Sequence, residues 1–172
     1  MTSVARVQAP PTKTGNLFRD SALGLVPETV EEIAALSRNV WQLLEIRPAL
    51  LELLRLRNAR TVNCQMCRAV RYDEARADGF TEEKASAVKD GYDESDLSPR
   101  EKLALAFADL YLRDPKGMTP AVAQKLKAEF SDRALAQMAV ALIAFNAASR
   151  SAVAIGGMPE ELPLIPMSVT AL

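Results

Sequence analysis

The residues best suited to chemistry are two cysteines, Cys64 and Cys67, the only cysteines in a 172-residue chain that contains no histidine. Without histidine there is no Ser-His-Asp or Cys-His pair, no histidine-ligated metal and no haem held by a histidine. Any proton transfer must use carboxylates, Tyr, Lys, Cys or water. Two cysteines are too few for a disulfide scaffold, so the C-x-x-C spacing is typical of a reactive or metal-binding pair.

The residues around the cysteines favour a redox pair. Asn63 is a suitable N-cap, which predicts a helix over 64–78 with Cys64 in its first turn. Free backbone N–H groups and the helix dipole favour a thiolate there. Arg68 and Arg71 each follow a cysteine by four residues, so the helix would place both cations on the cysteine face. Two sulfurs within one turn can cycle between dithiol and disulfide.

Other interpretations of the same residues stay open. Both cysteines fit the role of small buried apolar side chains, and the two arginines fit that of solvated charges paired with Asp73 or Glu74. A zinc ion needs four ligands, which this chain can supply only as four cysteines shared between two subunits. We expect neither a metal nor a cofactor.

The elements that must position these residues are predicted to be helices throughout. The start signals are a Thr29–Glu32 capping box, Pro48 in a first turn, a Ser98-Pro99-Arg100-Glu101 capping box and Thr119-Pro120. Helices are expected at about 30–38 and 39–46, from 48 with an apolar face reaching 59, at 64–78, 81–90, 99–113 and 120–129, and from 131 onward. No alternating run or internal repeat is present. We therefore predict an all-α, single-domain bundle of seven or eight helices over 28–155, between an irregular arm (1–27) and an extended tail (156–172).

Composition excludes several function classes. Hydrophobic residues make up 49% and charged residues 25%, and 21 basic against 22 acidic side chains leave a net charge of −1. That balance argues against a broadly basic nucleic-acid surface. No signal-peptide pattern and no uninterrupted apolar run of membrane-spanning length is visible. We expect a cytoplasmic protein with no nucleic-acid or membrane partner.

The segment from Glu52 to Gly79 reads E-x11-C-x-x-C-x-x-x-R-x7-G. Together with Leu97-Ser-Pro-Arg-Glu101, Phe130-Ser-Asp-Arg133 and Ala144-Phe-Asn-Ala147, it resembles the carboxymuconolactone decarboxylase and alkylhydroperoxidase D-like family over about 30–155. The resemblance implies the helical bundle of that family and an oligomer of two, three or six chains.

The resemblance also assigns roles. In the peroxidases of the family the second cysteine meets the peroxide, the first closes a disulfide, and a dithiol partner restores the pair. Carried over, Cys67 resembles the peroxidatic thiol, Cys64 the resolving thiol and Glu52 the assisting carboxylate. The position of the proton-relaying histidine is occupied by Arg71, and that of a second histidine in some members by Met66. With a pKa above about 12, an arginine stabilises a thiolate but does not shuttle protons.

Three outcomes follow from Arg71: Glu52 does the proton work with Tyr72 or water, the site only exchanges disulfides, or catalysis is lost. The predicted function is a thiol-dependent oxidoreductase acting on a small hydroperoxide or disulfide, with a protein dithiol as reductant. The alternatives are a lyase of the decarboxylase branch without redox cycling, and a non-enzymatic oligomeric redox sensor. Without the resemblance, Glu52 would be a surface carboxylate paired with Arg55 or Arg57. Asn146, on an apolar stripe, is expected to bond the backbone.

Overall fold

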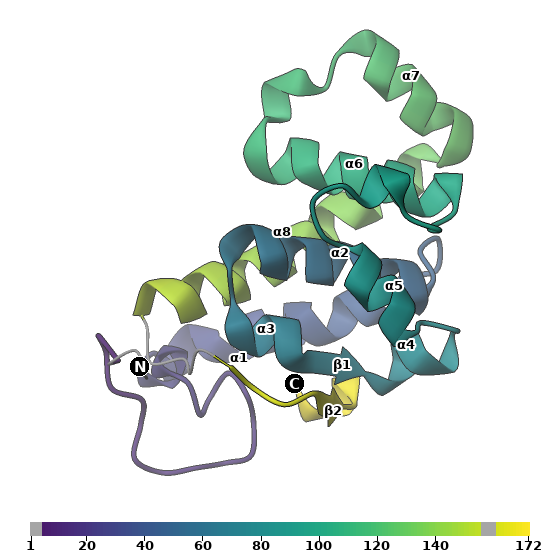
Figure 1. Ribbon diagram of the computed structural model, residues 1–172. Helices are drawn as coiled ribbons and strands as arrows, with labels where there is room; N and C mark the ends of the chain where they lie inside the picture. Colours follow the sequence, from purple (N-terminus) through teal and green to yellow (C-terminus); the bar gives the residue numbers. More distant parts are fainter. Residues whose placement is uncertain (1–4, 156–160) are drawn as a thin grey trace.

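The computed structural model of the chain describes residues 5–155 and 161–172, and over these residues the predicted all-α fold is confirmed (Figure 1). The described α-helices are α1 (Pro27–Asn39), α2 (Pro48–Val62), α3 (Gln65–Ala69), α4 (Asp73–Ala77), α5 (Glu82–Ala87), α6 (Pro99–Arg113), α7 (Pro120–Glu129) and α8 (Asp132–Ile155). Short 3-10 turns lie at Ala22–Leu25, Val40–Gln42, Tyr92–Glu94, Pro115–Gly117 and Val169–Ala171. Two three-residue strands, β1 (Val70–Tyr72) and β2 (Ile165–Met167), complete the fold.

Helix α2 is the centre of the bundle and packs against α8, α6, α4 and α3. Every residue from 50 to 59 is buried, although the stretch contains Glu52, Arg55, Arg57 and Asn58. A helix enclosed on all sides must give such side chains internal partners, because burial without a partner is costly. Arg57 accordingly makes ion pairs with Asp109 and Asp90, and the remaining three face the cysteines (described below).

Local signals set several helix starts as predicted. The Ser98 side chain accepts a hydrogen bond from the N–H of Glu101, which bonds back to Ser98 in a complete capping box. Thr119 caps α7, and Pro48 lies in the first turn of α2. The Thr29–Glu32 capping box is wrong: α1 already begins at Pro27, whose missing N–H costs nothing in a first turn.

The predicted helix over 64–78 is also wrong. Asn63 adopts a left-handed conformation (φ 58°) and ends α2, a role that asparagine tolerates better than most residues. Cys64 is instead the N-cap of a five-residue helix, α3. The chain then turns extended, and β1 pairs in parallel with β2, Val70 opposite Ile165 and Tyr72 opposite Met167. Strand β2 belongs to the tail, which folds back onto the domain over 161–172, while residues 156–160 of the predicted tail lie outside the described residues.

The N-terminal arm over residues 5–26 also folds against the body, and residues 1–4 of the predicted arm lie outside the described residues. Arg6 donates its backbone N–H to Ile155 O (2.8 Å) and its guanidinium to Val153 O and Ala154 O. The arm thereby covers the C-terminal end of α8.

By length and composition, α8 also meets the criterion for a helix that could cross a membrane. Counting uninterrupted apolar residues misses it because Asn146 and Arg150 lie within the helix. Its buried face packs against α2 and α1.

Candidate functional site

Cys64 and Cys67 are joined by a disulfide, with their Cα atoms 5.3 Å apart, as their spacing predicts. Cys64 is fully buried (0% exposed) because its N-cap position turns it inward, and its sulfur accepts the backbone N–H of Cys67 at 3.2 Å. Cys67 is only partly buried and lines a cavity of about 600 Å³. Of the two sulfurs, Cys67 is therefore the one that a molecule in the cavity can reach.

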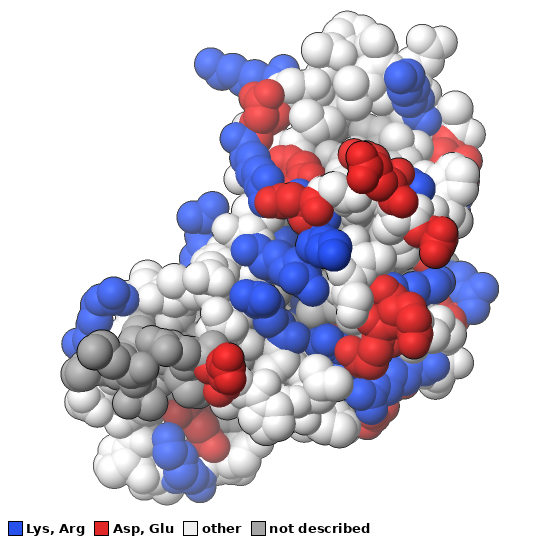
Figure 2. All heavy atoms as spheres, viewed as in Figure 1, with Lys and Arg blue, Asp and Glu red and all other residues white. Residues whose placement is uncertain are grey.

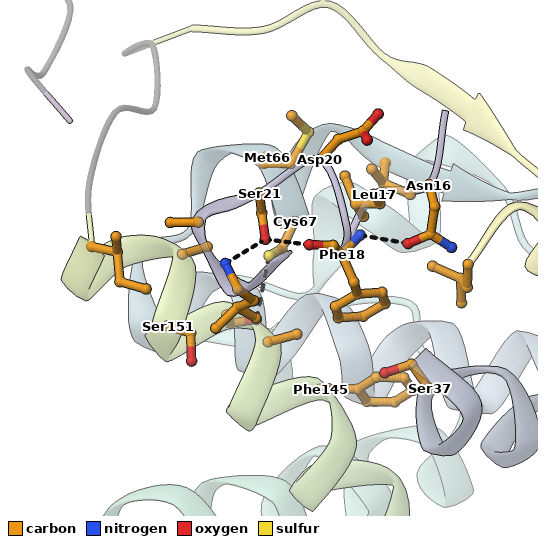
Figure 3. Close-up of a pocket in the computed structure, with 18 of the residues that line it drawn as sticks. Asn16, Leu17, Phe18, Asp20, Ser21, Ser37, Met66, Cys67, Phe145 and Ser151 are labelled. Carbon is orange, nitrogen blue, oxygen red and sulfur yellow. Dashed lines mark hydrogen bonds between the residues drawn. The ribbon is translucent and has the colours of Figure 1, made fainter. Parts of the chain in front are cut away.

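The cavity is mainly apolar. Its walls come from the N-terminal arm, α1, the turn after it, α2, α3, β1, α8 and the C-terminus. Figure 3 shows Cys67 and Met66 close to Ser21 and Phe18 of the arm. An apolar enclosure of this size suits an organic ligand with few polar groups.

The arm that closes the cavity is held by its own hydrogen bonds. Asn16 accepts the backbone N–H of Phe18 at 3.0 Å, and the Ser21 hydroxyl donates to Phe18 O at 2.7 Å (Figure 3). Asp20 accepts both the backbone N–H and the hydroxyl of Thr14 at 2.7 and 2.8 Å. These bonds, of which the one from the Thr14 backbone N–H has the largest effect, hold the pKa of Asp20 below its usual 3.8.

Glu52 lies next to the cysteine segment, but it acts there through Arg55. Glu52 is fully buried (0% exposed), and its two oxygens accept from Nε and Nη2 of Arg55, each at 2.7 Å. The same guanidinium donates to Cys67 O and, at 2.7 Å, to Val70 O. Burial opposes the charge of Arg55, yet the Glu52 carboxylate raises its pKa above the usual value. The buried ion pair thus fixes the backbone on both sides of the α3 C-terminus.

Tyr72 also faces the cavity. Its ring centroid lies 4.4 Å from that of Trp41, with the two ring planes tilted by 44°, and Arg55 lies 5.3 Å from the Tyr72 centroid. Burial raises the pKa of Tyr72 to about 12. Tyr72 therefore keeps its proton at any ordinary pH and is unsuited to act as a base.

Two residues at the sulfur were missed by sequence reasoning. The Ser149 hydroxyl of α8 donates to Cys67 Sγ at 3.3 Å, and Asn58 of α2 donates to Ser149 Oγ at 2.9 Å. The prediction that Asn146 bonds to the backbone is wrong: its side chain donates to the Asn58 side chain at 2.8 Å. The available signal was the spacing of Ser149, which continues the stripe of Leu142 and Asn146 at helical intervals.

The expectation that Arg68 and Arg71 lie on the cysteine face is wrong. Because the helix ends at Ala69 and β1 follows, Arg71 points to the other side, where it makes an ion pair with Glu82 (2.9 Å). Arg68 donates to Asn63 at 3.4 Å. Figure 2 shows basic side chains gathered over this part of the molecule.

The basic side chains line a second pocket of about 350 Å³ together with Arg60. Burial, and then the charges of Arg68 and Arg71, lower the pKa of Arg60. Its Nε is the one buried side-chain nitrogen or oxygen without a hydrogen-bond partner in the part of the chain that the structure describes. The positive charge of this region therefore lies away from the sulfurs.

Over residues 5–155 and 161–172, no cluster of three or more His, Cys, Asp or Glu side chains could hold a metal ion. The two cysteines, already bonded to each other, are the only thiol ligands in the sequence.

Comparison with known proteins points to one fold. No protein-family profile and no curated protein matches the chain. Among solved structures it is similar to a crystal structure from Agrobacterium tumefaciens, a protein of unknown function provisionally described as an antioxidant defence protein, AhpD. The two share 22% identity over 83% of this chain and 95% of the other, with a TM-score of 0.66. This likeness shows that the chain has an AhpD-like fold.

Proposed function

We propose that this chain, with its AhpD-like fold, is a thiol-dependent oxidoreductase whose reacting group is Cys67 and whose resolving group is Cys64. One observation carries the proposal: the bonded pair lies at an apolar cavity, with Cys67 lining it and Cys64 fully buried. The antioxidant description of the structural neighbour is consistent with it.

With a hydroperoxide, the reaction has two steps. The Cys67 thiolate attacks the outer oxygen, so that an S–O bond forms, the O–O bond breaks and the alkoxide takes a proton to leave as an alcohol. The Cys64 thiol then attacks the sulfenic sulfur, an S–S bond forms and water leaves. The peroxide gains two electrons and the dithiol loses two. A protein dithiol reductant returns two electrons and two protons.

The surroundings of the sulfurs favour an organic substrate. The cavity wall is mainly apolar, so an alkyl hydroperoxide or an organic disulfide of matching size fits better than a charged molecule. Met66, Val70 and Tyr72 would contact its apolar part. The basic pocket, which would attract anions, lies on the other side of the segment.

The remaining predicted residues take supporting roles. Glu52 holds Arg55, and Arg55 holds Cys67 O, so this ion pair keeps the disulfide segment in place. Tyr72 contributes a hydroxyl that stays protonated. Since the chain has no histidine, water is the proton donor to the leaving alkoxide. Arg68 and Arg71 would affect the Cys67 thiolate only through the long-range electrostatic field of their charges. We also propose a cytoplasmic location and an oligomer of two, three or six chains.

The experiment compares two matched variants. Reduced protein is mixed with cumene hydroperoxide, and both peroxide loss and free thiols are followed. The native chain should consume one peroxide for each pair of thiols lost. Cys64→Ser should stop at a sulfenic acid that a dimedone probe labels on Cys67, whereas Cys67→Ser should consume no peroxide.

Undiminished peroxide consumption by Cys67→Ser would overturn the proposal. If the native chain leaves the hydroperoxide intact but oxidises when given an organic disulfide, the activity is disulfide exchange. Turnover of a muconolactone without any change in thiols would support the lyase alternative.

A further inference from the structure

A chain of four polar side chains runs through the core and ends on a sulfur. Ser149 is 2% exposed and Asn58 is 0% exposed, so neither exchanges its partner for water. The Ser149 hydroxyl lies 3.3 Å from Cys67 Sγ, and the amide nitrogen of Asn58 lies 2.9 Å from Ser149 Oγ. Asn146 and Arg150 of α8 continue the chain outward to solvent.

The direction of every hydrogen bond in the chain follows from its outer end. A guanidinium can only donate, so the atom of Asn146 that faces Arg150 Nε at 2.8 Å is the oxygen Oδ1. The nitrogen of Asn146 then faces Asn58 and finds its oxygen at 2.8 Å. The nitrogen of Asn58 is left to donate to Ser149. The Ser149 oxygen is therefore an acceptor toward Asn58, and its proton is directed at Cys67 Sγ.

We propose that Ser149 is a catalytic hydrogen-bond donor that stabilises the Cys67 thiolate, with Asn58, Asn146 and Arg150 as positioning residues that fix the direction of its hydroxyl. The inference rests on the proposed function only in taking Cys67 as the reacting thiol. Bonds from neutral donors to a charged sulfur are strong in a buried site, and aligned donors polarise one another. The positive charge of Arg150 lies at the far end, where it favours negative charge at the near end.

Within residues 5–155 and 161–172, no competing side-chain donor reaches this sulfur. Of the described residues, Ser149 supplies the only side-chain hydrogen-bond donor at Cys67 Sγ. Arg55 of α2 is bonded to Glu52 and to the carbonyl of Cys67, and Tyr72 of β1 stays neutral. Arg71, the cation that the sequence placed here, is bonded to Glu82. The hydroxyl therefore carries the role at the thiolate that the arginines were expected to carry.

The test measures the thiolate directly. In a Cys64→Ser background, which leaves Cys67 as the one thiol, the alkylation rate by iodoacetamide is recorded from pH 4 to pH 10. Ser149→Ala should move the midpoint of this profile upward by about one pH unit, the effect of losing one hydrogen bond to a charged group. Asn58→Asp should do the same, because a carboxylate accepts from Ser149 and turns its proton away from the sulfur. Ser149→Thr keeps the hydroxyl and should restore the native midpoint.

The matched control is Ser151→Ala. Ser151 lines the same cavity from the same helix and is labelled in Figure 3, and no hydrogen bond joins it to either cysteine sulfur. Its replacement should leave the midpoint unchanged. Arg150→Gln, at an exposed site, should give a smaller upward shift without affecting folding, and it keeps the idea testable if a core variant does not fold.

Native midpoints in Ser149→Ala, Asn58→Asp and Arg150→Gln would overturn the role of Ser149. The measurement needs no peroxide, so its failure is separable from that of the proposed function. Peroxide consumption through Cys67 with unchanged midpoints would remove only the Ser149 role. Shifted midpoints without any peroxide or disulfide turnover would remove only the proposed function.

Discussion

The short segment α3–β1 has two faces with opposite character. One face lines the apolar cavity, and its residues are Met66, Cys67, Val70 and Tyr72. The other lines the basic pocket, and its residues are Gln65, Arg68, Ala69 and Arg71. On the cavity face, the Cys67 sulfur accepts a hydrogen bond from the Ser149 hydroxyl. On the other face, the guanidinium groups of Arg68 and Arg71 lie in one pocket with that of Arg60 from α2.

The difference shows how a change of backbone conformation re-sorts side chains. On a continuous helix, residues four apart share a face, which would place Arg71 beside Cys67. Because α3 ends at Ala69, the next residues alternate: Val70 and Tyr72 point to the cavity and Arg71 points away. The fold thus separates the sulfur chemistry from the positive charge that the sequence places beside it.

The largest expected effect is the difference in stability that is lost when the ion pair on each face is broken. Glu52→Gln leaves Arg55 charged and buried, and we expect it to lower the free energy of unfolding by about 3–5 kcal/mol. Glu82→Gln breaks the pair with Arg71, whose side chain is 8% exposed, but because the Glu82 side chain is 46% exposed the loss should be clearly smaller than that of Glu52→Gln. Urea unfolding of the oxidised variants measures both. Equal losses would contradict the contrast.

The next comparison introduces a histidine on the cavity face or on the basic face of the segment. Met66→His places an imidazole in the cavity beside Cys67, where it can transfer protons near neutrality, and should raise the rate of peroxide reduction about tenfold or more. Arg71→His places an imidazole at the position that the sequence resemblance assigns to a histidine, but on the other face, and should leave the rate unchanged. Stopped-flow mixing of reduced protein with peroxide gives both rates. A rise in Arg71→His that matches Met66→His would show that the faces communicate.

A smaller effect concerns alkaline pH. Burial raises the pKa of Tyr72 from 10.0 to about 12, so the folded state favours the protonated phenol. Its contribution to stability is complete below pH 10 and is lost as the pH rises from 10 to 12, because the unfolded chain ionises first. Tyr72→Phe should therefore lose less stability over that window. Tyr92, whose hydroxyl donates to Asp109, also has a pKa raised by burial, so Tyr92→Phe serves as the comparison. Unfolding at pH 9 and pH 11.5 provides the measurement.

The smallest effect lies in the arm, which covers only the cavity face. The hydrogen bonds from Thr14 and Gly15 depress the pKa of Asp20, so its contribution is present above pH 3.8 and is lost as the pH falls through the lower folded pKa. Pepsin, which works in acid, should therefore cut the arm faster as the pH falls from 4 to 2. In Asp20→Asn, which has no carboxyl to protonate at this position, the cleavage rate should not show this increase between pH 4 and pH 2.

The parts of the fold that were predictable depend on neighbours in sequence. Pro48, Ser98 and Thr119 mark helix starts through bonds within the first turn, so a local pattern is sufficient to find them. The disulfide pair is equally local, since three positions separate Cys64 from Cys67. The resemblance to the family located Glu52 near the cysteine segment, and the structure adds that Arg55 connects the two.

The parts that were missed depend on distant partners. Whether the chain after Ala69 is helical or extended is decided by β2, which lies about 95 positions later in the sequence. Ser149 is 82 positions from Cys67 and 91 from Asn58, so no local spacing identifies the bonds among them. The position of Arg71 depends on the same distant pairing. The helix stops at Ala69 because of tertiary packing, and Arg71 therefore lies on the face opposite the cysteines.

The contact of Trp41 with the Tyr72 ring gives the molecule an intrinsic fluorescent probe next to the site. Trp41 is the only tryptophan in the sequence, lies in the cavity wall and is also 6.0 Å from the ring of Phe145. Its emission therefore comes from a single, known position. Ligand entry at the sulfur should therefore change the wavelength and intensity of the tryptophan fluorescence, which can be measured in the native chain and in each variant without a label.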